Sequence, residues 1–200
     1  MHHGNKVIIG VGGNVGSGKT LVGRIFEELE AHYISADEIG WEVLSDITGE
    51  LKERFGEIIM DGDIIDKKKL RGVVFLNQEN LDYLNKLSHP ILVKKILKEI
   101  EEIESGMVVI DAALIFDWPE LMQVVDYPIL VVSDNEVKEK RALKRGIDKQ
   151  LFRQILESQK SEAEMSNLAK FVIKNNSTVD VLKTQCQDIY KEIKNDCRMQ

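Results

Sequence analysis

Eight consecutive residues near the start of the chain have the types and the spacing of a phosphate-binding loop. They are Gly13-Asn14-Val15-Gly16-Ser17-Gly18-Lys19-Thr20, and they match the pattern G-x-x-x-x-G-K-[ST]. Glycines let successive backbone N–H groups turn toward a ligand, because without a Cβ they tolerate positive φ. Lys19 would bring a positive charge toward the β- and γ-phosphates, and the Thr20 hydroxyl is placed to bind Mg²⁺. The pattern predicts a site for the phosphates of a nucleotide.

The residues on either side of this loop supply the context that such a site needs. The apolar run Val7-Ile8-Ile9 is typical of a buried strand, and after the loop apolar residues recur at helical spacing, namely Leu21, Val22, Ile25, Phe26 and Leu29. A helix here would point its partially positive N-terminus at the phosphates. The alternative is a glycine-rich turn without catalytic meaning. The strand before the motif and the helix after it favour the phosphate loop.

Two aspartates follow apolar strand segments, where ligands bind in α/β sheets. Asp37 stands after Ala36, which follows the short segment His32–Ser35, at the point where a helical pattern begins, so it fits either a ligand contact or a helix N-cap. Asp111 ends the strand segment Met107–Asp111. Downstream of a phosphate loop, such an acid is typical of a position near Mg²⁺, with a second structural cap as the alternative.

Basic residues elsewhere allow a catalytic and a structural interpretation. Arg141 and Arg145 stand four residues apart on one predicted helix, Glu136–Arg145, so they share a face. Paired arginines suit a transferring phosphoryl group, whereas the many neighbouring charges also fit a salt-bridged surface helix. His89 precedes Pro90, and from spacing alone it is better explained as a structural histidine.

The elements that must position these residues alternate between strand and helix. Five apolar segments are expected to form a parallel sheet in a three-layer α/β fold: Val7–Ile9, His32–Ser35, Met107–Asp111, Ile129–Val132 and Phe171–Ile173. A helical block over about 37–105 separates the second strand from the third. Ser88-His89-Pro90 is expected to break that block before a helix over Ile91–Ile103. A polar stretch over about 146–169, with a short helix at Phe152–Leu156, resembles a lid.

Length and composition indicate one domain. The 200 residues are 43% hydrophobic, and 27 basic against 34 acidic residues give a net charge of −7, which argues against a general nucleic-acid binder. Cys186 and Cys197 lie eleven residues apart on one predicted helix and are expected to remain free thiols. No apolar run reaches membrane-spanning length and the start MHHGNK does not resemble a signal peptide, so a cytoplasmic protein is expected. We assign no role to His2 and His3.

Taken together, these segments resemble the dephospho-coenzyme A kinase family over roughly residues 7–191. The matching pieces occur in the family's order: IIGVGGNVGSGKT, ISADEIGWEVL, DKKKLRGVVF, LNKLSHPIL, VVIDAALIF, VVSDNEVKEKRALKRG and SQKSEAEMSNLAKFVIKNNST. The first piece is shared by many P-loop proteins, whereas the Ala-Asp-Glu, Leu-Asn-x-x-x-His-Pro and Asp-x-x-Leu-x-Phe pieces are more selective. The resemblance implies a P-loop kinase-type fold. It also implies one domain over 1–200, with a core at about 1–36, 106–145 and 170–200, a substrate-binding insertion at about 37–105 and a lid at about 146–169.

The same resemblance implies transfer of the ATP γ-phosphoryl group to the ribose 3′-hydroxyl of dephospho-coenzyme A, the last step of coenzyme A synthesis. Asp37 would be the general base, with Lys19 and Arg141 stabilising charge on the phosphoryl group. The loop residues Gly13–Thr20, with Leu21, would hold ATP, and Arg145 and Asn175 would lie near its adenine. His89, Asp111 and Leu114 would lie on the substrate side, and Thr20 would hold Mg²⁺. A monomer or a weak homo-oligomer is expected, with no nucleic-acid or membrane partner.

The chain also departs from the family's usual residues. Gly12 stands where Thr is usual, and Trp41 where Arg or His is common. Ala113 replaces Pro, Asp117 replaces Glu and Lys170 replaces Asp. None of these changes removes Lys19, Thr20, Asp37 or Arg141, so they bear on substrate affinity more than on the class of reaction.

Three other functions compete with this one. Another P-loop kinase, acting on a nucleoside or nucleotide, would share the loop, the arginine helix and the lid. A regulatory GTPase switch should carry an Asn-Lys-x-Asp motif, which the sequence lacks. A paralogue that binds coenzyme A without catalysis is also compatible with the departures at Trp41 and Ala113.

Overall fold

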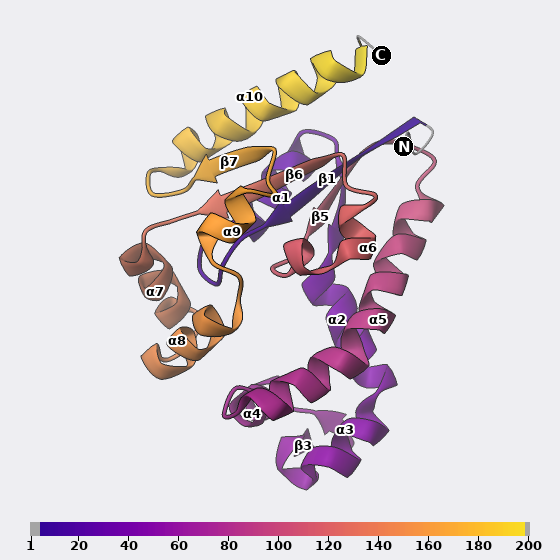
Figure 1. Ribbon diagram of the computed structural model, residues 1–200, viewed down its shortest axis with the longest axis vertical. Coiled ribbons are helices and arrows are strands. Elements are labelled where there is room, and N and C mark those ends of the chain that lie inside the picture. The colour runs from indigo at the N-terminus through magenta and orange to yellow at the C-terminus, as the bar shows by residue number, and fades with distance from the viewer. Residues whose placement is uncertain (1–4, 199–200) are drawn as a thin grey trace. The chain divides into compact units, whose positions relative to one another are not determined.

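The computed structural model describes residues 5–198 and divides into two units. One unit comprises Met1–Ser35 with Glu99–Gln200, and the other comprises Ala36–Lys98. Figure 1 labels helices and strands of both units. His2 and His3 lie outside the described residues. The first unit contains the phosphate loop and the large sheet, and each unit is described by itself.

The first unit is built on a five-stranded sheet whose strand order is β2-β5-β1-β6-β7. Its strands are β1 (Asn5–Gly12), β2 (His32–Ser35), β5 (Ser105–Asp111), β6 (Tyr127–Val132) and β7 (Phe171–Lys174). All neighbouring pairs are parallel. The first strand of the chain therefore lies in the middle, between β5 and β6. The carboxyl ends of β1 and β5 meet at one edge, where Val11 is in register with Asp111. In such sheets ligands bind at that edge, where the strand order reverses.

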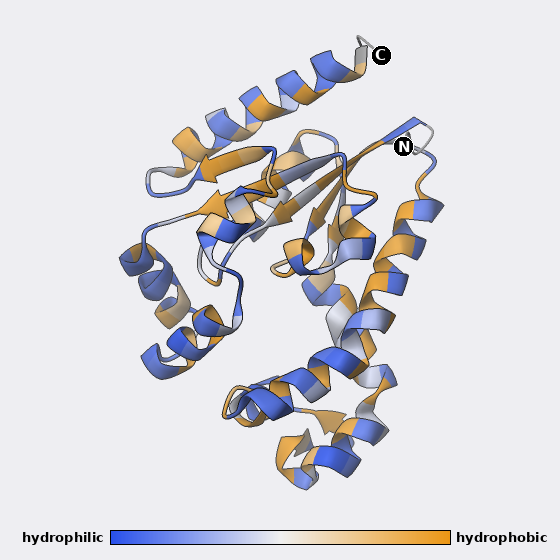
Figure 2. Ribbon diagram, in the orientation of Figure 1, coloured by the Kyte–Doolittle hydropathy of each residue, from blue (hydrophilic) through white to orange (hydrophobic). Residues whose placement is uncertain are grey.

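Successive residues of β1 face opposite sides of the sheet, and other elements pack against both sides. Ile9 and Val11 belong to a buried cluster that includes Phe26 of α1 (Lys19–Glu28) and Leu182 and Cys186 of α10 (Val179–Arg198). Because side chains alternate along a strand, Gly10 and Gly12 face the other way, toward Ile115 and Phe116 of η2 (Ile115–Asp117). Figure 2 shows hydrophobic strands inside and a striped α10 outside. A Cβ at Gly12 would meet the Phe116 ring, so glycine fits this position where the family usually has Thr.

Shorter helices complete the first unit. They are α6 (Pro119–Met122), α7 (Asn135–Lys144), α8 (Lys149–Ser158) and α9 (Glu162–Ser166). Asp148 caps α8 by accepting hydrogen bonds from the N–H groups of Gln150 and Leu151. Ser161 and Glu164 form a capping box at the start of α9. These caps fix where the two helices begin, and a three-residue connection, Gln159 to Ser161, joins α8 to α9.

The second unit is mainly helical. It contains α2 (Ala36–Asp46), α3 (Thr48–Phe55), η1 (Glu57–Ile59), the two-stranded ribbon β3 (Met60–Asp61) and β4 (Ile64–Ile65), α4 (Lys67–Val74) and most of α5 (Gln78–Glu102). The ribbon is antiparallel and turns at Gly62, which has a φ of 61°. The predicted helical character of this block is confirmed, and its role in binding substrate stays a prediction.

One expectation about this block is wrong. The sequence predicts a break at Ser88-His89-Pro90, but α5 runs without interruption from Gln78 to Glu102, with Pro90 inside it. Proline removes one N–H donor from the helix and crowds the carbonyl four residues earlier. On the C-terminal side of Pro90 the helix buries Leu92, Val93 and Ile96. We attribute its continuity to this packing, which outweighs the local preference of proline.

Candidate active site

The phosphate loop joins β1 to α1 in a backbone conformation that requires glycine at two points. Gly16 has a φ of 79° and Gly18 a φ of 96°, both in the left-handed region. A Cβ at Gly16 would collide with the backbone carbonyl of Lys138, and one at Gly18 with the Asn175 amide. Among the described residues, no acceptor receives the backbone N–H groups of Gly16, Gly18, Lys19 and Thr20. The loop therefore presents donors at the N-terminus of α1, as an anion site does.

Behind the loop, Arg141 of α7 fixes the loop's carbonyl groups. Its guanidinium donates to the carbonyls of Gly16 (3.3 Å) and Ser17 (3.1 Å), to the Ser133 hydroxyl (3.0 Å) and to the Asn175 carbonyl (2.9 Å). Burial lowers the pKa of Arg141, and the nearby charge of Arg145 lowers it further. Five donors in a planar fork suit Arg to such a site better than Lys. In this arrangement Arg141 supports the loop from behind.

Asn175, at the end of β7, completes the same network. Its side-chain amide donates to the Ser17 carbonyl at 2.8 Å, and its backbone carbonyl accepts from the Ser133 hydroxyl at 2.8 Å. Asn175 is 4% exposed and Ser133 is 5% exposed, so these contacts are shielded from water. The carboxyl ends of β6 and β7 thereby hold the loop that follows β1.

Asp111, at the end of β5, has one carboxylate oxygen without a hydrogen-bond partner in the described part of the chain. Its Oδ2 accepts a hydrogen bond from the Tyr33 hydroxyl at 2.9 Å. Its Oδ1 is buried and has no hydrogen-bond partner among the described residues. Burial, and then the Asp111 charge, raise the pKa of Tyr33, so the hydroxyl stays a donor. A buried carboxylate oxygen without a partner is costly, and its position at this edge suits it to bind a cation.

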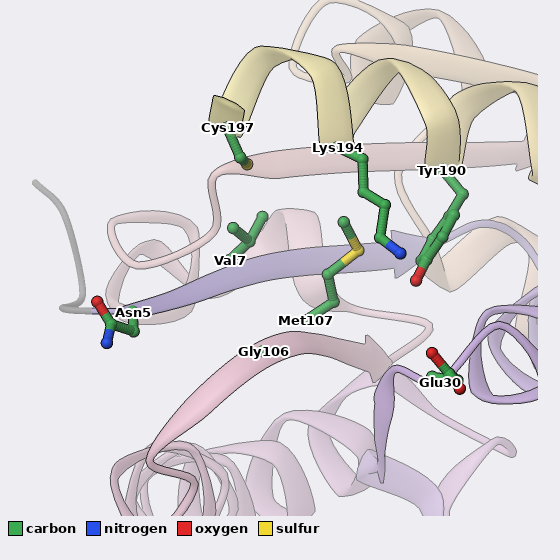
Figure 3. A pocket seen from close by; sticks show the side chains of 8 residues that line it. All are labelled: Asn5, Val7, Glu30, Gly106, Met107, Tyr190, Lys194 and Cys197. Carbon is green, nitrogen blue, oxygen red and sulfur yellow. The ribbon is translucent and has the colours of Figure 1, made fainter. Parts of the chain in front are cut away.

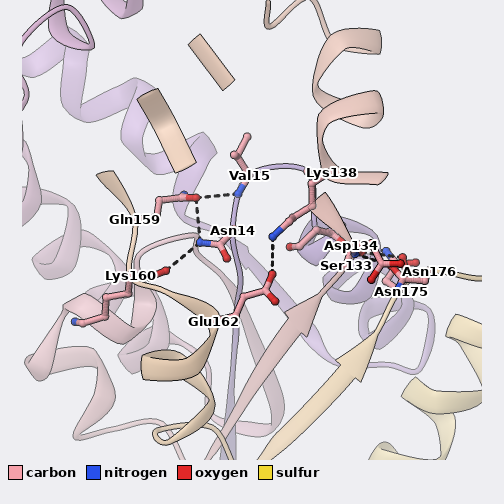
Figure 4. A network of polar contacts seen from close by, with 12 residues as sticks. Asn14, Val15, Ser133, Asp134, Lys138, Gln159, Lys160, Glu162, Asn175 and Asn176 are labelled. Atoms are coloured by element: carbon pink, nitrogen blue, oxygen red, sulfur yellow. Dashed lines mark hydrogen bonds and ion pairs between the residues drawn. The ribbon is translucent and has the colours of Figure 1, made fainter. Parts of the chain in front are cut away.

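The connection between α8 and α9 lies against the phosphate loop, as Figure 4 shows. The Gln159 side-chain carbonyl accepts from the Val15 N–H at 2.9 Å and from the Asn14 amide at 3.4 Å. The Asn14 amide also donates to the Lys160 carbonyl at 3.1 Å. Buried Lys138 of α7 forms an ion pair with Glu162 of α9 at 2.6 Å. The predicted lid is thus in contact with the loop.

Lys160 ties the same connection to the other side of the sheet edge. Its ammonium group lies 2.8 Å from the Asp117 carboxylate and donates to the Phe116 carbonyl at 2.9 Å. Asp117, one of the departures from the family pattern, therefore takes part in an ion pair of the first unit.

In the second unit, Asp37 is exposed and is the second residue of α2. It lies inside the first turn instead of preceding the helix, so it does not occupy the N-cap position. Trp41 lies one turn further on, and the Lys67 ammonium stands 3.4 Å from the centroid of its ring. This cation–π contact places a positive charge beside Trp41, the residue that stands where Arg or His is common.

The structure brings some predicted site residues together and leaves others separate. The phosphate loop, Arg141, Asn175 and Asp111 lie at one edge of the large sheet, where β1, β5, β6 and β7 end. Leu114 follows β5 directly before η2, and Arg145 and Leu21 are exposed on the same unit. Asp37 and His89 belong to the second unit.

Sequence reasoning missed Tyr33, Ser133, Lys138 and the contact that Gln159 makes. Each of the four makes a hydrogen bond with a residue at least 24 positions away in the chain, and no local pattern reveals such a contact. The only available signal was the polar character of Ser133 at the end of a buried strand.

A pocket of about 380 Å³ lies at the opposite edge of the sheet, where β1 and β5 begin (Figure 3). It is lined by Asn5, Val7, Glu30, Gly106, Met107, Tyr190, Lys194 and Cys197. Since the phosphate loop follows the carboxyl end of β1, this pocket is remote from the candidate site. Both cysteines are free, as expected, with Cys186 buried and Cys197 exposed. Within residues 5–198, no helix is long and apolar enough to span a membrane.

Comparison with known proteins places the chain in a family. Residues 7–180 match the family model described as dephospho-CoA kinase. The chain is 32% identical over 196 residues to a dephospho-CoA kinase of Fusobacterium nucleatum, which covers 96% of this chain and 97% of that protein. It is 30% identical over 193 residues to the enzyme of that name from Aquifex aeolicus, which covers 94% and 98%.

Solved structures agree with the fold. A Thermus thermophilus protein, TT1252, aligns with a TM-score of 0.77 at 24% identity, covering 94% of this chain and 98% of that one. A shikimate kinase from Acinetobacter baumannii aligns with a TM-score of 0.55 at 14% identity, covering 97% and 95%. These likenesses show the P-loop kinase type of fold. The family model and the relatives above show that this chain belongs to the dephospho-CoA kinase family.

Proposed function

We propose that the protein transfers the γ-phosphoryl group of ATP to the ribose 3′-hydroxyl of dephospho-coenzyme A, giving ADP and coenzyme A. The observation that carries this proposal is the phosphate loop at the sheet edge, in a chain that matches the dephospho-CoA kinase family over residues 7–180. The loop indicates that a nucleotide is the phosphoryl donor, and the family indicates that dephospho-coenzyme A is the acceptor.

The loop binds the ATP phosphates with its backbone N–H groups and with Lys19. The glycine conformations and the contacts of Arg141 and Asn175 fix the backbone that carries these donors. Such preorganisation matters in phosphoryl transfer, where positioning and charge stabilisation provide most of the catalysis. Arg141 would stabilise the phosphoryl group either through the loop or, after a side-chain movement, directly.

Mg²⁺ fits the residues at this edge. The unpartnered Asp111 Oδ1 is a hard oxygen ligand, and Thr20 adds a hydroxyl from the start of α1. Among the described residues no group of three or more His, Cys, Asp or Glu side chains could hold a metal ion. This agrees with Mg²⁺, which takes one or two protein ligands and completes its shell with water and nucleotide phosphates. When bound, the ion would neutralise charge on the β- and γ-phosphates.

Asp37 acts as the general base in this proposal. It orients the ribose 3′-hydroxyl and accepts its proton as the bond to phosphorus forms. The Asp37 carboxylate is exposed at the first turn of α2 and is therefore accessible to a substrate. The second unit, which carries Asp37 and His89, would bind the acceptor.

The test is ADP release with ATP and Mg²⁺ in the presence of dephospho-coenzyme A, run beside AMP, UMP and adenosine. We expect turnover with dephospho-coenzyme A alone. Turnover with a nucleotide or nucleoside acceptor would instead assign another small-molecule kinase activity. ATP binding without turnover of any acceptor would favour a non-catalytic paralogue.

A further inference from the structure

The proposed reaction does not explain why the Gln159 side chain forms a hydrogen bond with the phosphate loop. Three residues, Gln159 to Ser161, connect α8 to α9, and the first of them places a side-chain carbonyl on the Val15 N–H at 2.9 Å (Figure 4). Val15 is the third residue of the eight-residue motif. A neutral amide oxygen thus occupies a backbone donor next to the donors that would bind phosphate.

Gln159 also accepts a hydrogen bond from Asn14, which is buried. Asn14 is 3% exposed, and its side-chain amide donates to both the Gln159 carbonyl oxygen and the Lys160 backbone carbonyl. The Asn14 carbonyl in turn accepts from the Ser17 N–H at 3.1 Å, inside the loop. A movement of the α8–α9 connection would therefore disturb hydrogen bonds at the start of the phosphate loop.

Two ion pairs also hold this segment in place, but neither of them joins a side chain of the connection to the phosphate loop. Lys160 pairs with Asp117 beside η2, and Lys138 of α7 pairs with Glu162 of α9. Gln159 is the connection's side-chain link to the loop. Within the described residues its carbonyl oxygen is the acceptor for the Val15 N–H.

We propose that Gln159 is a lid-positioning residue: its amide oxygen couples the segment Lys149–Ser166 to the phosphate loop and so keeps water away from the ATP phosphates. This inference rests on the proposed kinase function. Water that reaches a bound γ-phosphoryl group competes with the acceptor hydroxyl, so a lid that is held shut favours transfer over hydrolysis. The Gln159 amide oxygen is neutral, so it accepts the hydrogen bond of the Val15 N–H without adding a negative charge beside the phosphates.

The experiment compares Gln159→Ala with Gln159→Glu, using Gln150→Ala as the matched control because Gln150 is an exposed glutamine of α8. The first readout is amide hydrogen exchange over residues 149–166 in the full chain without nucleotide. We expect Gln159→Ala to lose about two- to tenfold protection there, because a neutral hydrogen bond contributes a factor of that size to an equilibrium. Gln150→Ala should retain wild-type protection.

The second readout is the ratio of ATP hydrolysed to coenzyme A formed. We expect Gln159→Ala to raise this ratio at saturating dephospho-coenzyme A. Gln159→Glu can still accept the Val15 N–H, so it should keep the protection without nucleotide, whereas its charge should weaken ATP binding. This second variant separates loss of the contact from general damage to the fold.

Equal protection in Gln159→Ala and Gln150→Ala would overturn the coupling of the lid to the loop. Lost protection with an unchanged hydrolysis ratio would overturn the exclusion of water. If the wild-type protein makes no coenzyme A, the proposed function fails, and the exchange measurement still decides whether Gln159 holds the segment to the loop.

Discussion

Replacing Tyr33 with Phe removes a single hydroxyl from the candidate site. That hydroxyl donates to Asp111 Oδ2 at 2.9 Å. Asp111 is 4% exposed, and its Oδ1 already lacks a hydrogen-bond partner within residues 5–198. The variant would leave both carboxylate oxygens buried without a donor. A hydrogen bond to a charged group contributes about 1.5–3 kcal/mol, so we expect the free energy of unfolding to fall by about 2 kcal/mol. For a chain of this size the melting temperature should fall by roughly 4–8 °C.

The same variant tests the assignment of Asp111 to Mg²⁺. Tyr33 fixes the orientation of the carboxylate, and loss of such an outer partner commonly weakens metal affinity by 10- to 100-fold, so we expect the Mg²⁺ concentration for half-maximal ATP binding to rise by about tenfold. Saturating Mg²⁺ should restore ATP affinity. Titration calorimetry at several Mg²⁺ concentrations measures both quantities, with thermal unfolding run in parallel.

Tyr190→Phe is the matched control, because the Tyr190 ring packs near Phe26 and its hydroxyl makes no hydrogen bond among the described residues. We expect it to leave the Mg²⁺ dependence unchanged. An unchanged melting temperature in Tyr33→Phe would refute the energetic importance of the Tyr33–Asp111 bond. A lower melting temperature with an unchanged Mg²⁺ dependence would refute the placement of Mg²⁺ at Asp111.

Three further predictions concern the loop, the base and pH. Gly18→Ala should abolish ATP binding in calorimetry, because Gly18 has a φ of 96° and a Cβ there meets the Asn175 amide. The control Gly62→Ala, with a φ of 61° and open surroundings, should bind ATP normally. Normal binding by both variants would contradict the loop geometry. Asp37→Asn should reduce turnover by at least about 100-fold and leave ATP affinity nearly unchanged, while an equal loss of both would indicate a structural role. Burial, followed by the charges of Cys197 and Asp196, raises the pKa of Tyr127 from 10.0 to about 12, so the folded state keeps a proton that the unfolded state loses. The resulting stability is complete below about pH 10 and is lost as pH rises toward about 12, and chemical unfolding of Tyr127→Phe across this range should show a shallower decline than wild type.

Local patterns predicted the parts of the fold whose signal lies within a short window. The five strands appear where short apolar runs stand between turn residues, and the phosphate loop appears where its eight-residue motif stands between a strand and a helix. The break expected at Pro90 was wrong, because burial of Leu92, Val93 and Ile96 keeps α5 continuous. Local preference yields to packing at such a position.

The polar contacts of the site could not be predicted in the same way. Tyr33 contacts Asp111 across 78 positions, and Gln159 contacts Val15 across 144. Such pairs depend on which strand ends and connections the sheet brings together. The surroundings of Arg141 were also beyond reach, because a helix pattern cannot reveal that its guanidinium faces the loop carbonyls. The catalytic roles of Asp37, Lys19 and Arg141 stay predictions.

The most direct test of the proposed function is the position of the transferred phosphate. Wild-type protein is incubated with ATP, Mg²⁺ and dephospho-coenzyme A, and the product is analysed by ³¹P nuclear magnetic resonance and mass spectrometry. We predict one new phosphate monoester, on the ribose 3′-oxygen, formed in equal amount to ADP. A monoester at another hydroxyl, or free phosphate as the sole phosphorus product besides ADP, would contradict transfer to the 3′-hydroxyl.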